Sequence, residues 1–351
     1  MRLDTEVYRY LGKEEMRVLT AIEMGQKNHE LVPLPLIESI ANFRRGGVMP
    51  FIRELHKFKL IYHDSRPYEG YRLTYSGYDC LALKALAERG IISSAGRRIG
   101  VGKESDVHVC YLNEAVESAT PAQGSDESEA SDGEEDTAAI AVIKFHRLGR
   151  VSFRSVKNNR DYLGKRKNAS WMYLARLAAA KEYHYAKLLY SMKFPVPRPI
   201  DLNRHCIVMD HVEGVTLYQL RSSDIEEHEA ELLLSNINNI VHRLGCVGLI
   251  HGDLNEFNLI VDTQNYSVHV IDFPQVIHMN HENAEFYFNR DVEGVRTFFQ
   301  KKFGVGVAED LVPSFGRARL IFESSHQIEK VHSFIDEDDG AIEGVPQILD
   351  I

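Results

Sequence analysis

The sequence predicts an α+β protein with a small, mostly helical N-terminal domain followed by a larger domain of mixed strands and helices. Three observations support this prediction. The first ninety residues combine helical periodicity with two short β-like runs. Strand-like segments then surround a glycine-containing turn, and the second half is dominated by long helical segments. A chain of 351 residues is long enough for two or three domains.

Composition places the chain among ordinary globular proteins, with 44% hydrophobic residues. No apolar run approaches the roughly 18 residues that cross a bilayer, and the N-terminus is too charged for a secretory signal. The four cysteines are far apart and form no CxxC pair, so neither a disulfide scaffold nor a zinc site is expected. We therefore expect a cytoplasmic or nuclear protein with no membrane partner, and a monomer by default.

Charge is distributed unevenly along the chain, whose net charge is −10. Residues 113–138 contain nine acidic residues and no basic one. Residues 139–200 contain 14 Lys and Arg against two acidic residues, whereas residues 201–351 contain 10 against 26. A basic middle within an acidic protein indicates nucleic-acid contact.

The N-terminal ninety residues have the element order of a winged helix. The expected helices are 13–28, 35–43, 48–58 and 75–89, and the expected hairpin strands are 59–63 and 71–74. The second helix of the helix-turn-helix pair of such a domain usually enters a nucleic-acid groove. Arg53, Lys57 and Lys59 are therefore candidate nucleic-acid contacts. Winged helices also dock proteins, and that alternative stays open.

The second domain begins with strand, glycine turn and strand over residues 91–112. The acidic, low-complexity segment 113–138 is expected to be a disordered insert, because it cannot bury enough apolar surface. The basic segment 146–168 is expected to be a flexible loop. The other expected elements are strands at 140–145, 206–209 and 268–272, and helices at 169–191, 225–243 and 284–303.

The strongest chemical signal is the run 251–258, HGDLNEFN, followed by Asp272 after an apolar strand. Phosphoryl transfer needs one carboxylate, here Asp253, to orient or deprotonate the attacking group. It also needs an amide and a second carboxylate to hold magnesium against phosphate oxygens, and Asn258 and Asp272 suit that task. We interpret His251 as part of the scaffold of this loop.

Upstream residues supply the other parts of a phosphate site. Lys144 ends the strand-like run AVIK, typical of a lysine that neutralises phosphate charge. Glu182 is its expected partner, because it is the only acidic residue of 169–200. The segment from Gly100 to Val107 follows the pattern G-x-G-x-x-G-x-V, with a serine in place of the third glycine.

Several residues are therefore candidates for nucleotide contact. Backbone N–H groups and polar side chains of the glycine loop can reach phosphate oxygens. The strand end at 209–212 is expected to lie beside the adenine as a hinge. The candidates of these two segments are Gly100, Gly102, Lys103, Glu104, Ser105, Val107, Met209, Asp210 and Val212.

Together, GKES in the loop, HGDLNEFN and IDFPQ resemble the RIO-type atypical serine/threonine protein kinases. The winged helix and the basic loop resemble the winged-helix-bearing subfamily, the second RIO kinase. The resemblance implies a two-lobed kinase fold, with an N-lobe over 91–209, a C-lobe over 210–305 and a tail over 306–351. It implies ATP and magnesium as cofactors, Asp253 as the catalytic aspartate, Asn258 and Asp272 as metal ligands, and Lys144 as the phosphate-binding lysine.

The same resemblance implies a role in late cytoplasmic maturation of the pre-40S ribosomal particle and its 18S rRNA precursor, with nuclear shuttling. Only about ten residues separate IDFP from the next expected helix, so the long activation segment of ordinary protein kinases is missing. An ATPase switch with an aspartyl-phosphate intermediate is therefore a serious hypothesis. Asp253 is the first candidate for the nucleophile and Asp272 the second.

Three alternatives remain open from the sequence. Aminoglycoside and choline kinases share the His-Gly-Asp and Ile-Asp-Phe patterns, so a small-molecule phosphotransferase is one alternative. A ribosome-binding module clamped by ATP without catalysis is another. A DNA-binding regulator rests on the winged helix alone.

Overall fold

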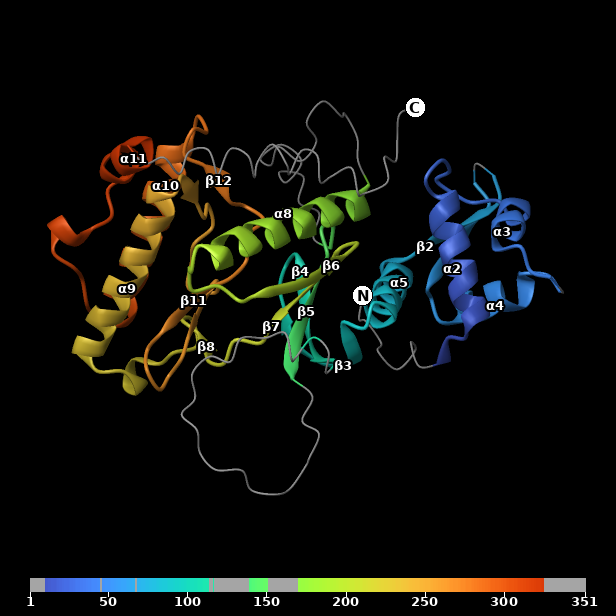
Figure 1. Cartoon of the computed structure of the whole chain (residues 1–351), viewed down its shortest axis with the longest axis horizontal. Helices are drawn as coiled ribbons and strands as arrows, with labels where there is room; N and C mark the ends of the chain where they lie inside the picture. The colour runs from blue at the N-terminus through green and yellow to red at the C-terminus, as the bar shows by residue number, and fades with distance from the viewer. Residues whose placement is uncertain are drawn as a thin grey trace, which may run out of the picture.

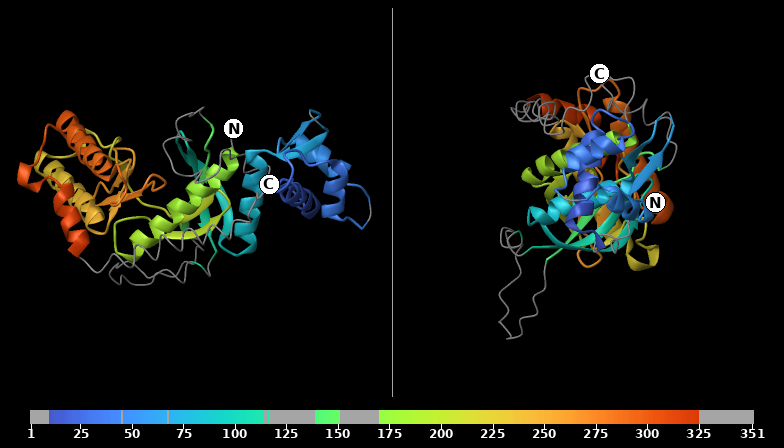
Figure 2. Two further views of the ribbon diagram at one scale, coloured as in Figure 1. Left: turned by 90° about the horizontal axis from the view of Figure 1, so that it is seen from above. Right: turned by 90° about the vertical axis from the view of Figure 1, so that its right-hand side faces the viewer.

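The structure is a computed structural model that describes residues 10–44, 46–66, 68–113, 116, 139–150 and 170–324. A helical domain lies at one end, a sheet with one long helix occupies the middle, and a second helical lobe lies at the other end (Figures 1 and 2). The predicted acidic insert 113–138 falls outside the described residues except for 113 and 116. The predicted basic loop 146–168 falls outside them beyond residue 150.

The N-terminal domain has the predicted winged-helix order. Its elements are α2 (Lys13–Gly25), α3 (Leu34–Ala41), α4 (Met49–Lys57), β1 (Ile61–Asp64), β2 (Gly70–Leu73) and α5 (Tyr75–Glu88). Pro50 lies in the first turn of α4, where its missing N–H does no harm. Thr74 caps α5 by accepting a hydrogen bond from the Gly77 N–H. A Cβ on Gly77 would lie 2.3 Å from the Leu60 carbonyl oxygen, so this close approach requires glycine.

Helix α5 belongs to two hydrophobic cores. Cys80 and Leu81 pack in the core of the winged helix, whereas Leu83 and Leu86 pack in the core beneath the adjacent sheet. The predicted boundary at residue 90 therefore marks where the chain leaves this helix, but packing joins the two domains along α5. Glu23 adds an ionic link, because its carboxylate lies 2.6 Å from both Arg176 and Arg204 of the next domain.

The middle of the molecule is a five-stranded antiparallel sheet of order β3-β4-β5-β7-β6. Its elements, with the helix that packs on it, are β3 (Ile92–Val101), β4 (Ser105–Leu112), β5 (Ile140–His146), α8 (Trp171–Ser191), β6 (Pro199–Asn203) and β7 (Cys206–Asp210). The strand β6 was not predicted, because its first residue is one of three prolines that signal only the end of the preceding helix. Helix α8 contacts β5, β6 and β7.

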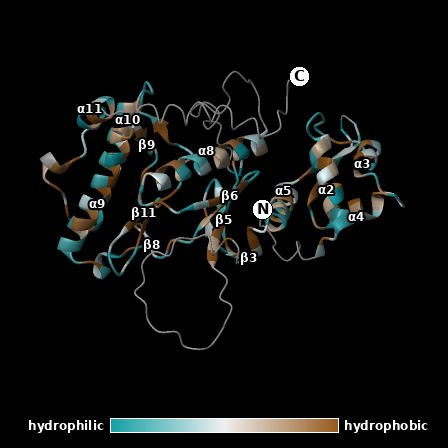
Figure 3. Cartoon of the chain, viewed as in Figure 1, coloured by the Kyte–Doolittle hydropathy of each residue, from teal (hydrophilic) through white to brown (hydrophobic). Residues whose placement is uncertain are grey.

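The C-terminal lobe consists of helices and short hairpins around one large core. Its elements are β8 (Val215–Thr216), η2 (Ser222–Asp224), α9 (Glu227–Cys246), β9 (Leu249–Ile250), β10 (Leu259–Val261), β11 (Val268–Val270), β12 (Ile277–His278), α10 (Ala284–Lys302), η3 (Glu309–Leu311) and α11 (Phe315–Ser324). The helices carry both hydrophobic and hydrophilic residues (Figure 3). Most of the apolar ones pack in this core, whereas Leu232, Phe286 and Leu320 are exposed.

Helix α11 changes the predicted C-terminal boundary. Its residues Phe315, Ala318 and Phe322 are buried in the core of the lobe. A Cβ on Gly245 of α9 would lie 2.8 Å from the Ala318 Cβ, so the two helices meet in close contact. The lobe therefore extends beyond the predicted end at residue 305, to Ser324 at least. The segment was assigned to the tail because the chain beyond residue 305 is acidic, although Phe315, Ala318 and Phe322 recur at helical spacing.

Among the residues that the structure describes, no helix combines the length and the apolar character needed to cross a membrane.

Candidate active site

Lys144 lies on β5, the central strand of the sheet, and its side chain is only 9% exposed. Its ammonium donates hydrogen bonds to Glu182 Oε1 on α8 at 2.7 Å and to Asp272 Oδ1 at 2.9 Å. Burial disfavours the ammonium, but the carboxylates of Asp272 and Glu182 outweigh burial and raise the pKa of Lys144. The predicted Lys144–Glu182 pair is confirmed, and the lysine is a fixed buried cation.

Glu182 also faces a histidine that sequence reasoning missed. Its Oε2 lies 3.0 Å from His146 Nε2, and both side chains are almost fully buried. His146 and Lys144 are two residues apart on β5, so both point to the same side of the sheet. One carboxylate on α8 is thus placed between two basic side chains of one strand.

The run 251–258 forms a loop that starts directly after β9. Gly252 has a positive φ of 76°, which places its backbone in the region that favours glycine. Buried His251 lies 3.2 Å from the Ile271 carbonyl oxygen through Nε2. Burial lowers the pKa of His251, so a neutral ring can donate to that carbonyl. His251 is therefore a structural residue of the loop, as predicted.

A buried carboxylate on α10 anchors this loop. Asp291 accepts hydrogen bonds from the Gly252 N–H at 2.7 Å and from the Leu254 N–H at 3.1 Å. Burial raises the pKa of Asp291 to about 7. Arg290 donates to the Gly252 carbonyl oxygen. Sequence reasoning missed Asp291. The available signal was an acidic residue within the apolar stripe of a helix, on the same face as Phe288.

Asp253, the predicted catalytic aspartate, is fixed by neighbours on both sides. Gln275 donates from Nε2 to Asp253 Oδ2 at 2.6 Å. The Asp253 carbonyl oxygen accepts from the side-chain amides of Asn255 and Asn258 at 3.0 and 2.9 Å. Gln275 was not predicted as a site residue, although it stands just after the IDFP segment. The carboxylate is thus held in one orientation by a neutral donor.

Asp272 and Asn258 are brought together because the Ile271 N–H donates to the Asn258 carbonyl oxygen at 3.0 Å. Asp272 has a φ of 74°, an uncommon conformation for a residue with a side chain. Burial favours its neutral form, but the Lys144 ammonium outweighs burial and lowers the pKa of Asp272. The structure therefore presents an ionised Asp272 carboxylate one residue after a segment that is hydrogen-bonded to the Asn258 backbone, and the metal-binding role of both residues stays a prediction.

These two side chains fit magnesium. Among the described residues, Asn258 uses its amide nitrogen as a donor and its amide oxygen accepts no hydrogen bond. Asp272 gives one oxygen to Lys144, and its other oxygen accepts none within the described part of the chain. No group of three or more His, Cys, Asp and Glu among the described residues could hold a metal ion. Magnesium suits such a site, because it needs few protein oxygens when phosphates supply the rest.

The glycine loop joins β3 and β4 at the edge of the sheet. Its turn is closed by a 2.8 Å hydrogen bond from the Gly102 N–H to the Ser105 carbonyl oxygen. Val107 is paired with Lys144 in the register of β4 and β5, so the loop is anchored beside the lysine strand. Gly100, Lys103 and Glu104, the remaining predicted residues of this loop, lie on the same hairpin.

The predicted hinge lies at the end of β7. Met209 is paired with Val142, one strand from the lysine. Asp210 is engaged elsewhere, because its carboxylate lies 3.1 Å from Arg198 and its N–H donates to the Arg198 carbonyl oxygen. The Asp210 carboxylate and N–H are thus already engaged by Arg198, and the nucleotide contacts of Met209, Asp210 and half-buried Val212 stay predictions.

The candidate nucleic-acid contacts belong to a different part of the molecule. Arg53 and Lys57 are exposed on α4, and Lys59 is exposed just after this helix with a φ of 57°. They lie in the winged-helix domain, which is separated from the C-terminal lobe by the sheet (Figure 1). The residues predicted to contact nucleic acid and those predicted to transfer phosphate therefore lie on separate surfaces.

Two family models match this arrangement. One, described as "Rio2, N-terminal", matches residues 8–89, and the other, described as "RIO domain", matches residues 127–311. The chain belongs to the Rio2 branch of the RIO family. The RIO-domain match includes Lys144, Glu182 and the loops that carry Asp253 and Asp272, whereas the glycine loop lies between the two matches.

Rio2 proteins of several organisms are similar to the chain. "Serine/threonine-protein kinase rio2" of Dictyostelium discoideum is 49% identical over 303 residues, which cover 86% of this chain and 53% of that protein. The protein of the same name from Schizosaccharomyces pombe is 45% identical, over 86% of this chain and 80% of its own length. The chain thus spans about half the length of the Dictyostelium relative and of the Caenorhabditis elegans Rio2, of which it covers 52%.

A solved structure of the Rio2 kinase from Chaetomium thermophilum, described as an "ADP/Mg2+-phosphoaspartate complex", has the same fold. Its TM-score to the chain is 0.70 at 40% sequence identity, and the match covers 97% of this chain and all of that one. The predicted combination of a winged helix with a RIO kinase domain is therefore confirmed.

Proposed function

We propose that this Rio2 family member transfers the γ-phosphoryl group of ATP in a magnesium-dependent reaction. The observation that carries the proposal is the buried Lys144 ammonium, held at 2.7 and 2.9 Å between Glu182 and Asp272. The loop of Asp253 and Asn258 is hydrogen-bonded to the segment before Asp272. Relatives named serine/threonine-protein kinases, and a neighbour described as an ADP/Mg2+ complex, support the proposal.

Each side chain has a distinct task in this proposal. Lys144 offers a positive charge to phosphate oxygens, and Glu182 keeps the ammonium oriented. Asn258 and Asp272 hold magnesium, which neutralises phosphate charge when it is bound. Gln275 and the backbone anchored by Asp291 keep Asp253 in one orientation toward the reacting group. Preorganised charge of this kind lowers the barrier without reorganisation during the reaction.

The finer proposal is an ATPase switch in which an aspartate accepts the phosphoryl group. The described segment between Asp272 and α10 contains only short β12, which is paired with β9. Its backbone is used within the lobe and offers a protein substrate little to dock on. A carboxylate oxygen attacks the γ-phosphorus, ADP leaves with the bonding electrons, and water then cleaves the acyl phosphate to inorganic phosphate. The description of the Chaetomium neighbour as a phosphoaspartate complex supports this proposal.

Asp253 is the first candidate for this acceptor and Asp272 the second. Asp253 contacts a neutral amide, Gln275, whereas Asp272 is already shared between Lys144 and the proposed metal site. Borohydride reduction of the phosphorylated protein converts an aspartyl phosphate into homoserine, and peptide mass spectrometry then locates it. Homoserine at position 253 supports the first assignment, homoserine at position 272 replaces it by the second, and homoserine at neither position contradicts the covalent step.

Nucleotide chemistry can be tested separately from the acceptor. We expect the full chain to bind a fluorescent ATP analogue only with magnesium and to release phosphate from ATP. Lys144→Met and Asp272→Asn should each abolish phosphate release, while the half-buried control Lys84→Met should not, since Lys84 lies on α5 and pairs with Glu88 outside the site. Phosphorylation of small alcohols would instead favour the aminoglycoside or choline kinase alternative.

We further propose that the winged helix binds the 18S rRNA precursor within the pre-40S particle. Support comes from the exposed Arg53, Lys57 and Lys59 and from the wing, where the Arg72 guanidinium lies 4.7 Å from the centre of the Tyr62 ring. Each lost phosphate contact should make the slope of log affinity against log salt less negative by about 0.7–0.9. The double variant Arg53→Ala/Lys57→Ala should therefore lose about two contacts in RNA binding.

The exposed Lys13 of α2 provides a matched control, because it carries the same charge outside the predicted helix pair. Equal salt slopes for the wild type and the double variant would contradict RNA contact through α4. Maturation supported normally by an Asp253→Ala variant would favour the alternative of an ATP-clamped module without catalysis. Localisation in the cytoplasm with nuclear shuttling is part of the same proposal.

A further inference from the structure

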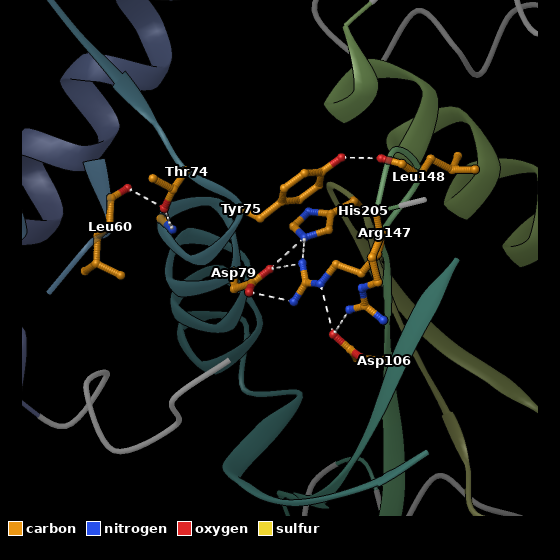
Figure 4. Close-up of polar contacts among 10 residues, drawn as sticks. Leu60, Thr74, Tyr75, Asp79, Asp106, Arg147, Leu148 and His205 are labelled. Carbon is orange, nitrogen blue, oxygen red and sulfur yellow. Dashed lines mark hydrogen bonds and ion pairs between the residues drawn. The ribbon is translucent and has the colours of Figure 1, made fainter. Parts of the chain in front are cut away.

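A second group of buried charges joins the winged helix to the glycine loop (Figure 4). The Arg147 guanidinium forms a two-pronged ion pair with Asp79 of α5, with both N–O distances at 2.7 Å. Its Nε also donates to Asp106 Oδ2 of β4 at 3.2 Å. His205 Nε2 lies 2.8 Å from Asp79 Oδ1. One side chain therefore links the last helix of the winged helix to the strand that leaves the glycine loop.

Arg147 begins a turn that holds the glycine loop through its backbone. The Arg147 N–H donates to the Glu104 carbonyl oxygen at 2.5 Å. Arg150, at the end of the turn, donates to the Gly102 carbonyl oxygen at 3.0 Å and also pairs with Asp106. The turn is thus hydrogen-bonded to the loop at the residues expected to approach phosphate. Arg147 stands three residues after Lys144, so the end of β5 carries both the lysine of the candidate active site and the arginine of this second group of charges.

The other residues of the turn are fixed by contacts with α5 and α8. Leu148 is buried against α8, and the Tyr75 hydroxyl of α5 donates to its carbonyl oxygen. Gly149 has a φ of 95°, and a Cβ there would lie 2.6 Å from the Trp171 ring. Because α5, α8 and the glycine loop all contact residues 147–150, a displacement of α5 must move the turn or break the Arg147 pair.

The charges of this group make the link stiff. Burial favours the neutral forms of Asp79 and Asp106. At Asp79 the neighbouring Arg147 and His205 outweigh burial and lower the pKa of the carboxyl. At Asp106 the neighbouring Arg150 and Arg147 do the same. Burial also lowers the pKa of His205 to about 4, so this histidine is neutral. Removing one partner of a buried pair leaves an uncompensated charge, which is strongly destabilising. The pair therefore resists separation.

We propose that Arg147 is a positioning residue that couples the seating of the winged helix on α5 to the position of the phosphate-binding loop. The inference rests on the proposed function, because it takes the glycine loop as the place where ATP phosphates bind. A ligand that shifts α5 would then change nucleotide affinity, and nucleotide would change the affinity for that ligand by the same factor. The winged helix is thus connected to the nucleotide site through a defined chain of contacts.

The test uses two ion pairs that join the same two domains. Asp79 contacts Arg147, whereas Glu23 contacts Arg176 and Arg204 and lies outside the glycine-loop group. In the full chain with magnesium, Asp79→Asn should weaken binding of a fluorescent ATP analogue by about tenfold, within the usual range of coupling between sites. Glu23→Gln should lower the melting temperature but leave this affinity within about twofold.

Two further variants keep the inference testable if Asp79→Asn does not fold. The Arg150 side chain is 25% exposed, and Arg150→Gln removes its contacts with Gly102 and Asp106 while Asp79 and Arg147 stay paired. It should weaken nucleotide binding while lowering the melting temperature less than Asp79→Asn does, because Asp106 keeps its contact with Arg147. Arg147→Lys keeps the charge but loses the two-pronged geometry, and it should give an intermediate affinity.

The outcomes separate this inference from the function on which it rests. Failure of the wild type to bind the ATP analogue would reject the proposed function. Binding by the wild type with equal affinities for Asp79→Asn and Glu23→Gln would reject the coupling alone. Unchanged affinity in Arg150→Gln would reject the role of the turn in holding the loop.

Discussion

Replacing Lys144 with methionine should destabilise the fold as well as abolish phosphate binding. Methionine matches the lysine stem in length but removes the ammonium, leaving Glu182 and Asp272 without their shared partner. Breaking a buried ion pair costs about 3–5 kcal/mol. The Glu182 side chain is 3% exposed and keeps only His146 beside its other oxygen, whereas that of Asp272 is 38% exposed and is partly solvated. We therefore expect Lys144→Met to lower the free energy of unfolding by about 3 kcal/mol, the lower end of this range.

A double-mutant cycle isolates the pair. In Lys144→Met/Glu182→Gln both charges are gone, so the double variant should be more stable than the sum of the single effects by about 2 kcal/mol. Urea unfolding measures the four free energies. The matched control is the Lys84–Glu88 pair, whose side chains are 31% and 67% exposed and 3.6 Å apart, and for which we expect a coupling of about 0.3–0.5 kcal/mol. A Lys144–Glu182 coupling as small as that of the control pair would refute the reasoning.

Three further predictions concern the support of the site. Thr74→Ala should lower the free energy of unfolding by about 1 kcal/mol, because α5 loses its cap; an unchanged urea midpoint would contradict this. Gly149→Ala should cost about 1–3 kcal/mol in thermal unfolding, owing to its φ of 95°, and a neutral effect would refute the strain. Asp291 has its pKa raised by burial to about 7 from 3.8. The folded protein therefore holds a proton that the unfolded chain has lost, and this stability disappears as the pH rises through 7. Between pH 5.5 and 8.5 the wild type should lose about 2 kcal/mol more than Asp291→Asn in urea unfolding, and parallel profiles would contradict the assignment.

Local patterns in the sequence were sufficient to predict many of the candidate site residues. Asp253 and Asn258 share one short motif, Asp272 follows an apolar strand, and the structure joins their segments through one backbone hydrogen bond. Glu182 was found by elimination, because α8 offers no other acidic residue near its middle. The winged helix was predicted from element order alone, since turns and hairpins leave clear local signals.

The parts that were missed depend on contacts between distant segments. Asp79 and Arg147 are 68 residues apart in sequence, and neither belongs to a motif that predicts the pair. Asp291 stands within the apolar stripe of α10, but the sequence does not show that it accepts hydrogen bonds from the loop of Gly252 and Leu254. Helix α11 becomes part of the lobe because Gly245 leaves room for Ala318. Long-range packing, which no local pattern specifies, decides each of these.

The central claim is phosphoryl transfer from ATP by this site, and the fate of the γ-phosphate tests it most directly. The full chain would be incubated with γ-labelled ATP and magnesium, with and without small-subunit precursors. Free phosphate, stable Ser/Thr phosphate and hydroxylamine-labile phosphate would be counted together. We predict mostly free phosphate with a labile protein-bound fraction, both lost in Asp253→Asn. Abundant stable phosphate on another protein, without a labile fraction, would contradict the ATPase switch, and no transfer at all would contradict the site itself.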